Sequence, residues 1–428
     1  MRNDQLTLNV NVLDVGLHLA AWRAPDLHGR SFLDPQHYRR CAELAERGAL
    51  DALFLADVPA IRDDPRMKPS RNLEPTVVLG TVAAATENLG LIVTASTTFN
   101  DPVELADRLL SLDTVSGGRL GWNAVTTYHE ATAANFGLDG HPDRATRYAR
   151  AGEFVDVVRA LWDSAATGRA VHHRGEHLAL DGLLTVPPSA QGAPAIVQAG
   201  GSAWGRDLAA RSADAVFSAE LTLEAGQRHY ADVKDRARRL GRDPDAIRIL
   251  PGLVTVLGGT EAEALARHES YERHVPAGHA LGRLGGVLGV DLATLDLDAP
   301  VPDHLLDDPP EPERFRGALG FREAVVRVAR ERRPTLRGLL REFGGYGHRL
   351  VVGTPEQVAD TIADWFETRA ADGFNLMPDA LPSGLEDFVE HVVPLLRARG
   401  LFRHEYAGTT LRERYGLAGT GAEKGATA

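Results

Sequence analysis

Short apolar runs alternate with longer segments of helical periodicity along most of the chain. The runs typical of buried strands cover 6–12, 53–56, 89–95, 119–123, 195–199, 213–217, 247–256 and 374–377. Helices are predicted over 35–47, 74–86, 102–115, 144–162, 204–211, 223–240, 355–371 and 385–399. Because parallel strands need crossover connections, this alternation predicts a parallel α/β sheet, and eight units suit a closed (β/α)8 TIM barrel. A doubly wound open sheet would alternate in the same way.

Two segments interrupt the alternation. The first, 164–194, predicts an excursion with a hairpin, and the second, 258–350, is a larger insertion with a Pro- and Asp-rich loop over 296–312. In barrels such insertions lie in loops near the active-site end and often form lids. We therefore expect one barrel domain over 1–417 with two insertions, and a disordered Gly-, Ala- and Thr-rich tail over 418–428.

Composition narrows the class of protein. With 428 residues, 43% of them hydrophobic and 25% charged, the chain can bury a large core and is not disordered. A formal net charge of −12 disfavours a nucleic-acid partner. The single cysteine, Cys41, excludes an internal disulfide and falls in the first predicted helix, away from the strand ends. No long uncharged apolar segment or signal-peptide pattern is present, so we expect a cytoplasmic protein with no membrane partner.

Polar residues follow several predicted strands. Asp57 comes directly after the second strand, Thr94 and Thr97 lie at the end of the third, and Asn123 ends the fourth. Barrel enzymes place their chemistry at the carboxyl ends of the strands. Hydroxyl and carboxamide groups there can bind the polar edge of a heteroaromatic ring. Each of these residues also suits a structural role as a helix cap, a turn residue or an ion-pair partner.

A glycine-rich turn joins the fifth predicted strand to a helix. In the run Gly200-Gly201-Ser202, backbone N–H groups at the helix start can bind phosphate. The run is neither a P-loop nor a dinucleotide-binding Gly-x-Gly-x-x-Gly. A serine cap on a tight glycine turn explains the pattern equally well.

A histidine pair is the only feature that suggests a metal. His173 and His177 are four residues apart, which suits ligands on a helix, but their setting predicts a hairpin, where that spacing loses its meaning. We therefore predict no metal site.

These motifs, in this order, resemble the flavin-dependent monooxygenases of the bacterial luciferase-like superfamily. The branch they resemble most is the nitrilotriacetate and dibenzothiophene-sulfone monooxygenase family, and the resemblance runs from about 17 to 417. Its marks include Ala21-Trp22-Arg23-Ala24-Pro25, Ala56-Asp57, 94–99, 113–127, Arg147-Tyr148-Ala149-Arg150-Ala151, Gly201-Ser202, Val352-Gly353-Thr354-Pro355-Glu356 and Asp372-Gly373-Phe374-Asn375.

The resemblance implies a barrel that binds FMN at the carboxyl ends of its strands. By position, the residues around the isoalloxazine ring would be Asp57, Thr94, Thr97 and Asn123, and those around the phosphate would be Arg144, Tyr148, Gly201 and Ser202. Arg144 stands where relatives often have a histidine. Since an arginine can hold a phosphate through two hydrogen bonds, flavin binding is compatible with this change.

The resemblance also implies a reaction. Reduced FMN (FMNH₂) would react with O₂ to give a flavin peroxide that inserts one oxygen atom into a small organic substrate. Such two-component enzymes take FMNH₂ from a separate NAD(P)H:FMN reductase, and a homodimer or homotetramer is expected. Two alternatives stay open: a deazaflavin-dependent oxidoreductase of the same superfamily, and a flavin-binding protein without catalysis.

Three residues are candidates for the substrate side. His18 ends the first strand with Trp22 nearby, and a histidine there suits an acid, a base or an orienting group. A structural histidine in a loop is an equal alternative. His348 lies at the end of the large insertion and is placed to close over the pocket.

Overall fold

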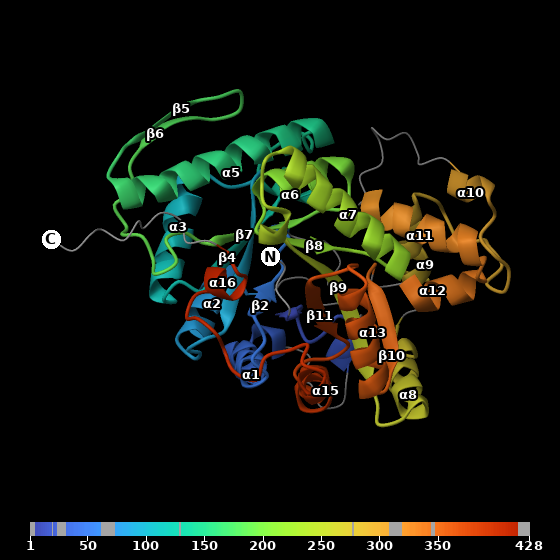
Figure 1. Cartoon of the computed structure of the whole chain (residues 1–428). Helices are drawn as coiled ribbons and strands as arrows, with labels where there is room; N and C mark the ends of the chain where they lie inside the picture. The colour runs from blue at the N-terminus through green and yellow to red at the C-terminus, as the bar shows by residue number, and fades with distance from the viewer. Residues whose placement is uncertain are drawn as a thin grey trace.

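Eight parallel strands close a barrel in the computed structural model (Figure 1). The structure describes residues 5–18, 20–23, 31–60, 73–127, 130–275, 278–307, 319–343 and 347–417. The barrel strands are β1 (Thr7–Asn11), β2 (Ala52–Leu55), β3 (Gly90–Ser96), β4 (Leu120–Val125), β7 (Ala195–Ala199), β8 (Ala215–Ser218), β9 (Arg248–Leu257) and β11 (Gly373–Pro378). They pair in this order, and β11 pairs back with β1 in parallel. The predicted (β/α)8 TIM barrel is confirmed.

The strands form where the sequence has its apolar runs because both of their faces are covered. Every residue of β1, β2, β9 and β11 is buried, which matches the near-continuous hydrophobic character of parallel strands. The long β9 pairs with β8 through its first half, Arg248–Pro251, and with an additional strand, β10 (Arg349–Gly353), through its second half. The sequence pattern did not predict β10.

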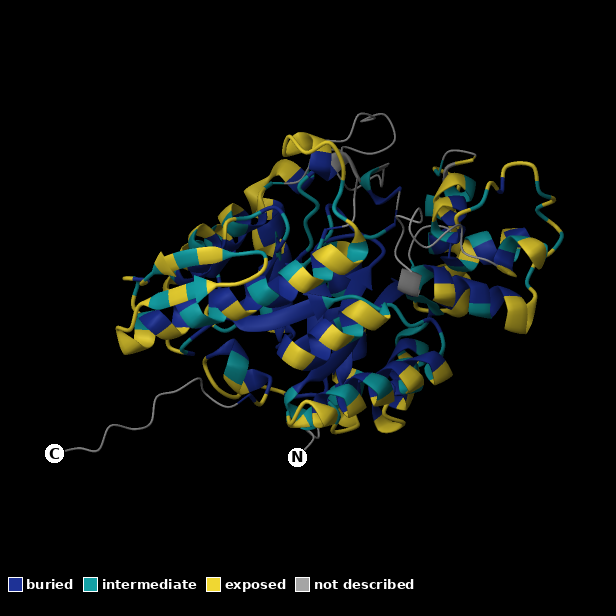
Figure 2. Cartoon of the chain, turned by 90° about the horizontal axis from the view of Figure 1, so that it is seen from above, coloured by how far each residue is buried: buried dark blue, intermediate teal, exposed yellow. Residues whose placement is uncertain are grey.

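Helices cover the outside of the barrel. Those between the strands are α1 (Pro35–Arg47), α2 (Pro75–Ala83), α3 (Pro102–Val115), α4 (Glu130–Asn135), α5 (Arg144–Thr167), α6 (Ala203–Ser212), α7 (Leu223–Arg239) and α13 (Pro355–Glu367). After β11 come α14 (Ser383–Asp387), a π-helical turn (Phe388–Val392), α15 (Val393–Ala398) and the short α16 (Leu411–Arg414). Figure 2 shows the buried strands at the centre and the exposed residues on the outer faces of the helices.

Side-chain caps start most of the long helices. Asp34, Asp101, Asp143, Ser202 and Thr222 each accept a hydrogen bond from a backbone N–H of the first turn that follows. These caps fix the first residues of α1, α3, α5, α6 and α7. They therefore also fix where the loop between each strand and its following helix ends. The loops at the carboxyl end of the barrel are thereby held in place.

Two groups of elements extend the barrel where the sequence predicts insertions. A hairpin of β5 (Val171–Arg174) and β6 (Ala179–Gly182) runs along α5 (Figure 1). Between β9 and β10 lie α8 (Glu261–Glu272), α9 (His279–Leu288), α10 (His304–Asp307), α11 (Leu319–Arg332) and α12 (Leu336–Phe343). Helices α9–α12 share a hydrophobic cluster of their own at one side of the barrel. Among the described residues, no helix combines the length and apolar composition that crossing a bilayer requires. The predicted tail, 418–428, lies outside the described residues.

Candidate functional site

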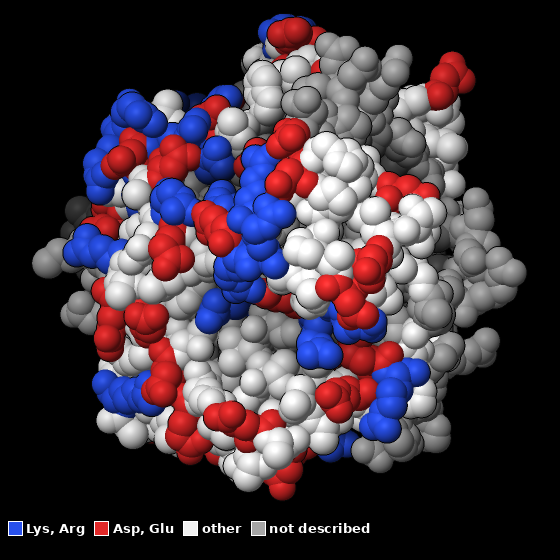
Figure 3. Space-filling view, turned by 90° about the vertical axis from the view of Figure 1, so that its right-hand side faces the viewer, with Lys and Arg blue, Asp and Glu red and all other residues white. Residues whose placement is uncertain are grey.

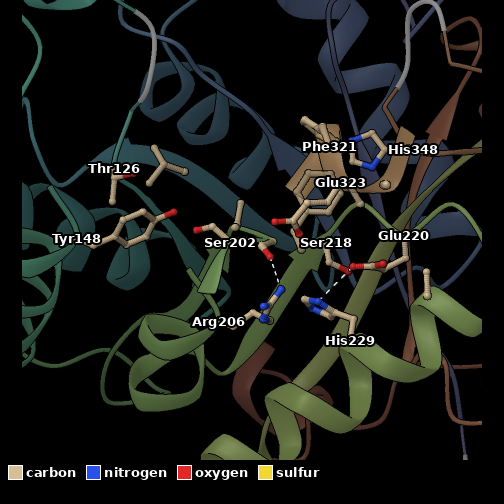
Figure 4. Close-up of a pocket in the computed structure, with 18 of the residues that line it drawn as sticks. Thr126, Tyr148, Ser202, Arg206, Ser218, Glu220, His229, Phe321, Glu323 and His348 are labelled. Atoms are coloured by element: carbon tan, nitrogen blue, oxygen red, sulfur yellow. Dashed lines mark hydrogen bonds and ion pairs between the residues drawn. The ribbon is translucent and has the colours of Figure 1, made fainter. Parts of the chain in front are cut away.

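A cavity of about 470 Å³ opens at the carboxyl end of the barrel (Figure 4). Its walls come from the loops after β2, β4, β7 and β8, from helices α5, α6 and α7, and from α11 of the insertion. Its size lies within the range of about 300–1,000 Å³ that is usual for small-molecule sites. Six of the residues predicted from the sequence line it: Asp57, Arg144, Tyr148, Gly201, Ser202 and His348.

The turn between β7 and α6 forms a cradle at one end of this cavity. Ser202 caps α6, and its Oγ accepts the Gly205 N–H at 3.2 Å. A side chain on Gly200 would lie 3.1 Å from the Tyr148 Oη, and one on Gly205 would lie 2.8 Å from the Gly200 carbonyl oxygen. Figure 4 shows the Tyr148 hydroxyl pointing toward Ser202. The close packing leaves a helix N-terminus facing the cavity, which favours an anionic group such as a phosphate.

Two arginines of α5 lie beside this cradle. Arg144, which was predicted to lie around a phosphate, begins the helix and lines the cavity. Arg147, which the sequence did not single out as a site residue, is buried and donates to the carbonyls of Thr127 at 2.7 Å and Pro142 at 3.1 Å. These bonds hold the Arg147 guanidinium at the cavity wall, where its charge adds to that of Arg144.

A second group of predicted residues lies deeper in the barrel, outside the cavity lining. Thr94 and Asn123 face each other in register across β3 and β4, and the Asn123 Nδ2 donates to the Thr94 Oγ1 at 2.9 Å. Within the described part of the chain, the Asn123 Oδ1 is then a buried acceptor without a partner, as is the Gln198 Oε1. Buried unsatisfied acceptors of this kind suit a ligand that brings N–H donors. Thr97 instead donates its hydroxyl to the Val125 carbonyl at 3.2 Å.

His348 forms part of an aromatic wall of the cavity. Its ring stacks on Phe217 at 5.1 Å and meets the edge of Phe321 at 5.4 Å. A side chain on Gly252 would lie 2.3 Å from the His348 Nδ1, so the glycine leaves room for the ring. Burial lowers the pKa of His348 to about 4, although a hydrogen bond to the Ser218 backbone opposes the shift. The imidazole is therefore neutral near pH 7.

His18 and Trp22 lie outside this cavity. The His18 Nε2 lies 2.9 Å from the Glu272 Oε1, and its Nδ1 accepts the Ala20 N–H at 3.1 Å. His268 brings a third group, and the ligand atoms of His18, His268 and Glu272 all lie within 4.8 Å of one another. Since the His18 Nδ1 is an acceptor, its Nε2 carries the proton and donates to Glu272, which disfavours a metal at that nitrogen. Trp22 packs against a small apolar cluster.

A carboxyl–imidazole pair that the sequence did not reveal lies in the cavity. The Glu220 Oε1 lies 3.2 Å from the His229 Nδ1 (Figure 4). Burial raises the pKa of Glu220 to about 7 against the opposing charges of Arg327, Arg206 and Arg228. Burial likewise lowers the pKa of His229 to about 4. Glu220 follows β8, so the strand-end argument that identified Asp57 would also have found it.

Glu220 makes the stability of the protein depend on pH. Its raised pKa means that the folded chain holds a proton that the unfolded chain releases above its ordinary pKa of 4.5. The contribution of this group to the free energy of unfolding therefore falls as pH rises from about 4.5 through about 7. We expect Glu220→Gln to reduce this fall by about 2 kcal/mol, measured by urea unfolding at about pH 5 and pH 7.5. The exposed Glu367→Gln is the control, and equal slopes in the two variants would contradict the assignment.

Comparison with known proteins assigns the chain to a family. Residues 15–372 match the luciferase-like monooxygenase family. Nitrilotriacetate monooxygenase component A of Aminobacter aminovorans is 41% identical over 97% of each chain, and dibenzothiophene-sulfone monooxygenase of Rhodococcus erythropolis is 37% identical over 93% of each. A solved riboflavin lyase with modified FMN and riboflavin superposes with a TM-score of 0.82 at 30% identity, covering 96% of each chain. The resemblance noted from the sequence is confirmed: the chain belongs to the luciferase-like monooxygenase family and is an enzyme.

Proposed function

We propose that the chain is an FMNH₂- and O₂-dependent monooxygenase of a two-component system, which oxidises a small organic substrate with flavin from a separate NAD(P)H:FMN reductase. The observation that carries the proposal is the cradle of Gly200, Gly201 and Ser202 with Tyr148 at the edge of the cavity. It suits a single phosphate, and the chain has no dinucleotide fingerprint. The relative named component A and the solved relative with modified FMN support the same reading.

The residues present fit a flavin mononucleotide. The start of α6 would hold its phosphate, with charge from Arg144 and Arg147. The unpartnered Oδ1 of Asn123 suits an N–H at the polar edge of the ring, and Asp57 adds a carboxylate at the cavity wall. Two of the four predicted ring residues, Thr94 and Asn123, are thus fixed to each other by a hydrogen bond before any ligand arrives.

Reduced flavin, when bound, supplies the electrons that activate O₂. The chain's own residues would shape the place where this happens. Phe217 and Phe321 exclude water beside His348, and exclusion of water protects reactive oxygen chemistry from wasteful side reactions. Because the other ring nitrogen bonds to the Ser218 backbone, the His348 Nδ1 is an acceptor, and it is buried beside Gly252. With a pKa of about 4, His348 is a neutral part of the aromatic wall and a weak base near pH 7.

Anaerobic titration of the purified chain with FMNH₂ tests the proposal. We expect saturable binding, with Asp57→Ala and Asn123→Ala each weakening it about tenfold, as loss of one hydrogen bond to a polar ring edge predicts. Circular dichroism should show an intact fold in both variants. The exposed Asp107→Ala on α3 is the matched control and should bind as the wild type does. Unchanged affinity in both site variants would refute the ring-edge assignment, and tighter binding of a reduced deazaflavin would replace FMN as the cofactor.

A further inference from the structure

We propose that the substrate of this site is an organic anion, whose carboxylate or sulfonate group is held by Arg228 of α7 and Arg327 of α11. The proposal rests on the function proposed above and adds the substrate class to it. Three observations support it. They are the charge of the cavity lining, the lack of ion-pair partners for two of its arginines within the described residues, and the aromatic wall.

The cavity is locally basic in an acidic protein. The whole chain has a formal net charge of −12, which would slow the approach of an anionic ligand. The cavity lining, in contrast, has five arginines and four acidic residues: Arg144, Arg147, Arg206, Arg228 and Arg327 with Asp57, Glu220, Asp232 and Glu323. Figure 3 shows Lys and Arg gathered in a band over the face that carries the insertion helices. The local charge therefore favours anions at this mouth.

The arginines of the cavity differ in what they already bind. Arg147 donates to backbone carbonyls, and Arg206 forms an ion pair with Asp232 at 2.6 Å. Arg228 and Arg327 make no ion pair or side-chain hydrogen bond within the part of the chain that the structure describes. Both line the same cavity as Glu220, and the charges of both act on its carboxyl group. An anionic group bound there would be attracted by Arg228 of the barrel helix α7 and by Arg327 of the insertion helix α11.

The rest of the cavity suits the organic part of such a ligand. Phe217, Phe321 and His348 form an aromatic wall beside β8 and α11. Figure 4 shows Phe321 and His348 on the side of the cavity away from Tyr148, the residue assigned to the flavin phosphate. An apolar body against the rings and an anionic group against the guanidiniums would use both surfaces at once. Arg144 and Arg147 of α5 would remain with the flavin phosphate.

Glu220 makes this binding sensitive to pH. Its carboxylate competes with the ligand for Arg228 and Arg327, and with a pKa of about 7 it becomes neutral as pH falls. The other groups facing it are the neutral His229, Asp232 in its pair with Arg206, and the exposed Glu323. We therefore expect anions to bind more tightly at about pH 6 than at about pH 8. Glu220→Gln should bind tightly across this range.

The test compares two probes of nearly the same size and shape, the anionic naphthalene-2-sulfonate and the neutral naphthalene-2-sulfonamide. Each is titrated by calorimetry into the full chain saturated with FMN. Wild type should prefer the sulfonate, and Arg228→Gln combined with Arg327→Gln should weaken sulfonate binding about 30-fold, since charge-assisted hydrogen bonds are the strong ones. Sulfonamide binding should stay unchanged. Arg239→Gln on α7 and Arg330→Gln on α11 are exposed controls on the same two helices and should leave both probes unaffected.

The outcomes separate this inference from the proposed function. Equal binding of the two probes by wild type, or unchanged sulfonate binding in the double variant and in each single variant, would overturn the anion site. A loss of FMN affinity in these variants would assign Arg228 and Arg327 to the flavin phosphate and would also overturn it. If wild type fails to bind FMN, the proposed function fails, and the sulfonate titration without FMN still decides the anion site by the same criteria.

Discussion

Replacing Ser202 by aspartate is expected to weaken FMNH₂ binding at least about 100-fold while the fold persists, because a carboxylate close to a phosphate costs several kcal/mol at a partly exposed site. Aspartate caps helices as well as serine does, so α6 should still begin at the same residue. The new charge would lie where the proposed phosphate binds, and it would take the N–H groups that the phosphate needs. Anaerobic titration with FMNH₂ measures the affinity, and circular dichroism measures the helix content.

Two other variants show whether charge at this turn is the cause. Thr222 caps α7 in the same manner and is not part of the cavity lining, so Thr222→Asp should leave FMN binding unchanged. Ser202→Ala should cost only about 1 kcal/mol, because backbone N–H groups share the phosphate. If Ser202→Asp binds FMN as tightly as wild type, the phosphate lies elsewhere.

Removing the carboxylate of Asp51 is expected to lower the free energy of unfolding by about 4 kcal/mol, because it leaves a buried guanidinium unpaired. Asp51 is fully buried after α1, where its Oδ2 accepts the Leu8 N–H at 2.7 Å and its Oδ1 accepts from the Arg403 Nη2 at 2.8 Å. Arg403 is also buried and donates to the Ala49 carbonyl. Asp51→Ala breaks this network, and urea unfolding measures the loss.

An exposed ion pair gives the comparison for this variant. Asp360 pairs with Arg399 on the surface, and Asp360→Ala should cost no more than about 1 kcal/mol. A similar small loss for Asp51→Ala would show that the buried network at the amino end of the barrel does not hold β1 against the chain's last segment. FMN binding should be unaffected by either change, because both lie away from the cavity lining.

The barrel could be predicted from the sequence because its strands are covered on both faces. Each of the eight barrel strands overlaps an apolar run, and the caps of the helices are readable as Asp, Ser or Thr before a helical segment. β10 was missed because its residues Arg349–Val352 are only half-buried and carry a charge. Helical periodicity runs through 321–343, but the structure has two helices there, α11 and α12, and Pro334 lies at the break between them.

The sequence allowed a cavity residue to be predicted only where that residue lies at the end of a strand or in the loop that follows it. Asp57, Gly201 and Ser202 line the cavity for the reason given from the sequence, since they follow parallel strands. Arg228 and Arg327 come from the middle of helices that are distant in sequence, and only the packing of α11 against the barrel brings them together. The prediction that His18 ends the first strand is wrong: β1 ends at Asn11, and His18 lies in the following loop, where its bond to Glu272 joins it to α8 outside the cavity.

Anaerobic titration of FMNH₂ into wild type, Ser202→Asp and Thr222→Asp decides whether this cavity is the flavin site. We expect one FMNH₂ bound per chain in wild type and in Thr222→Asp, and a loss of at least about 100-fold in affinity in Ser202→Asp. Absence of binding in wild type, or equal affinity in all three proteins, would contradict this expectation.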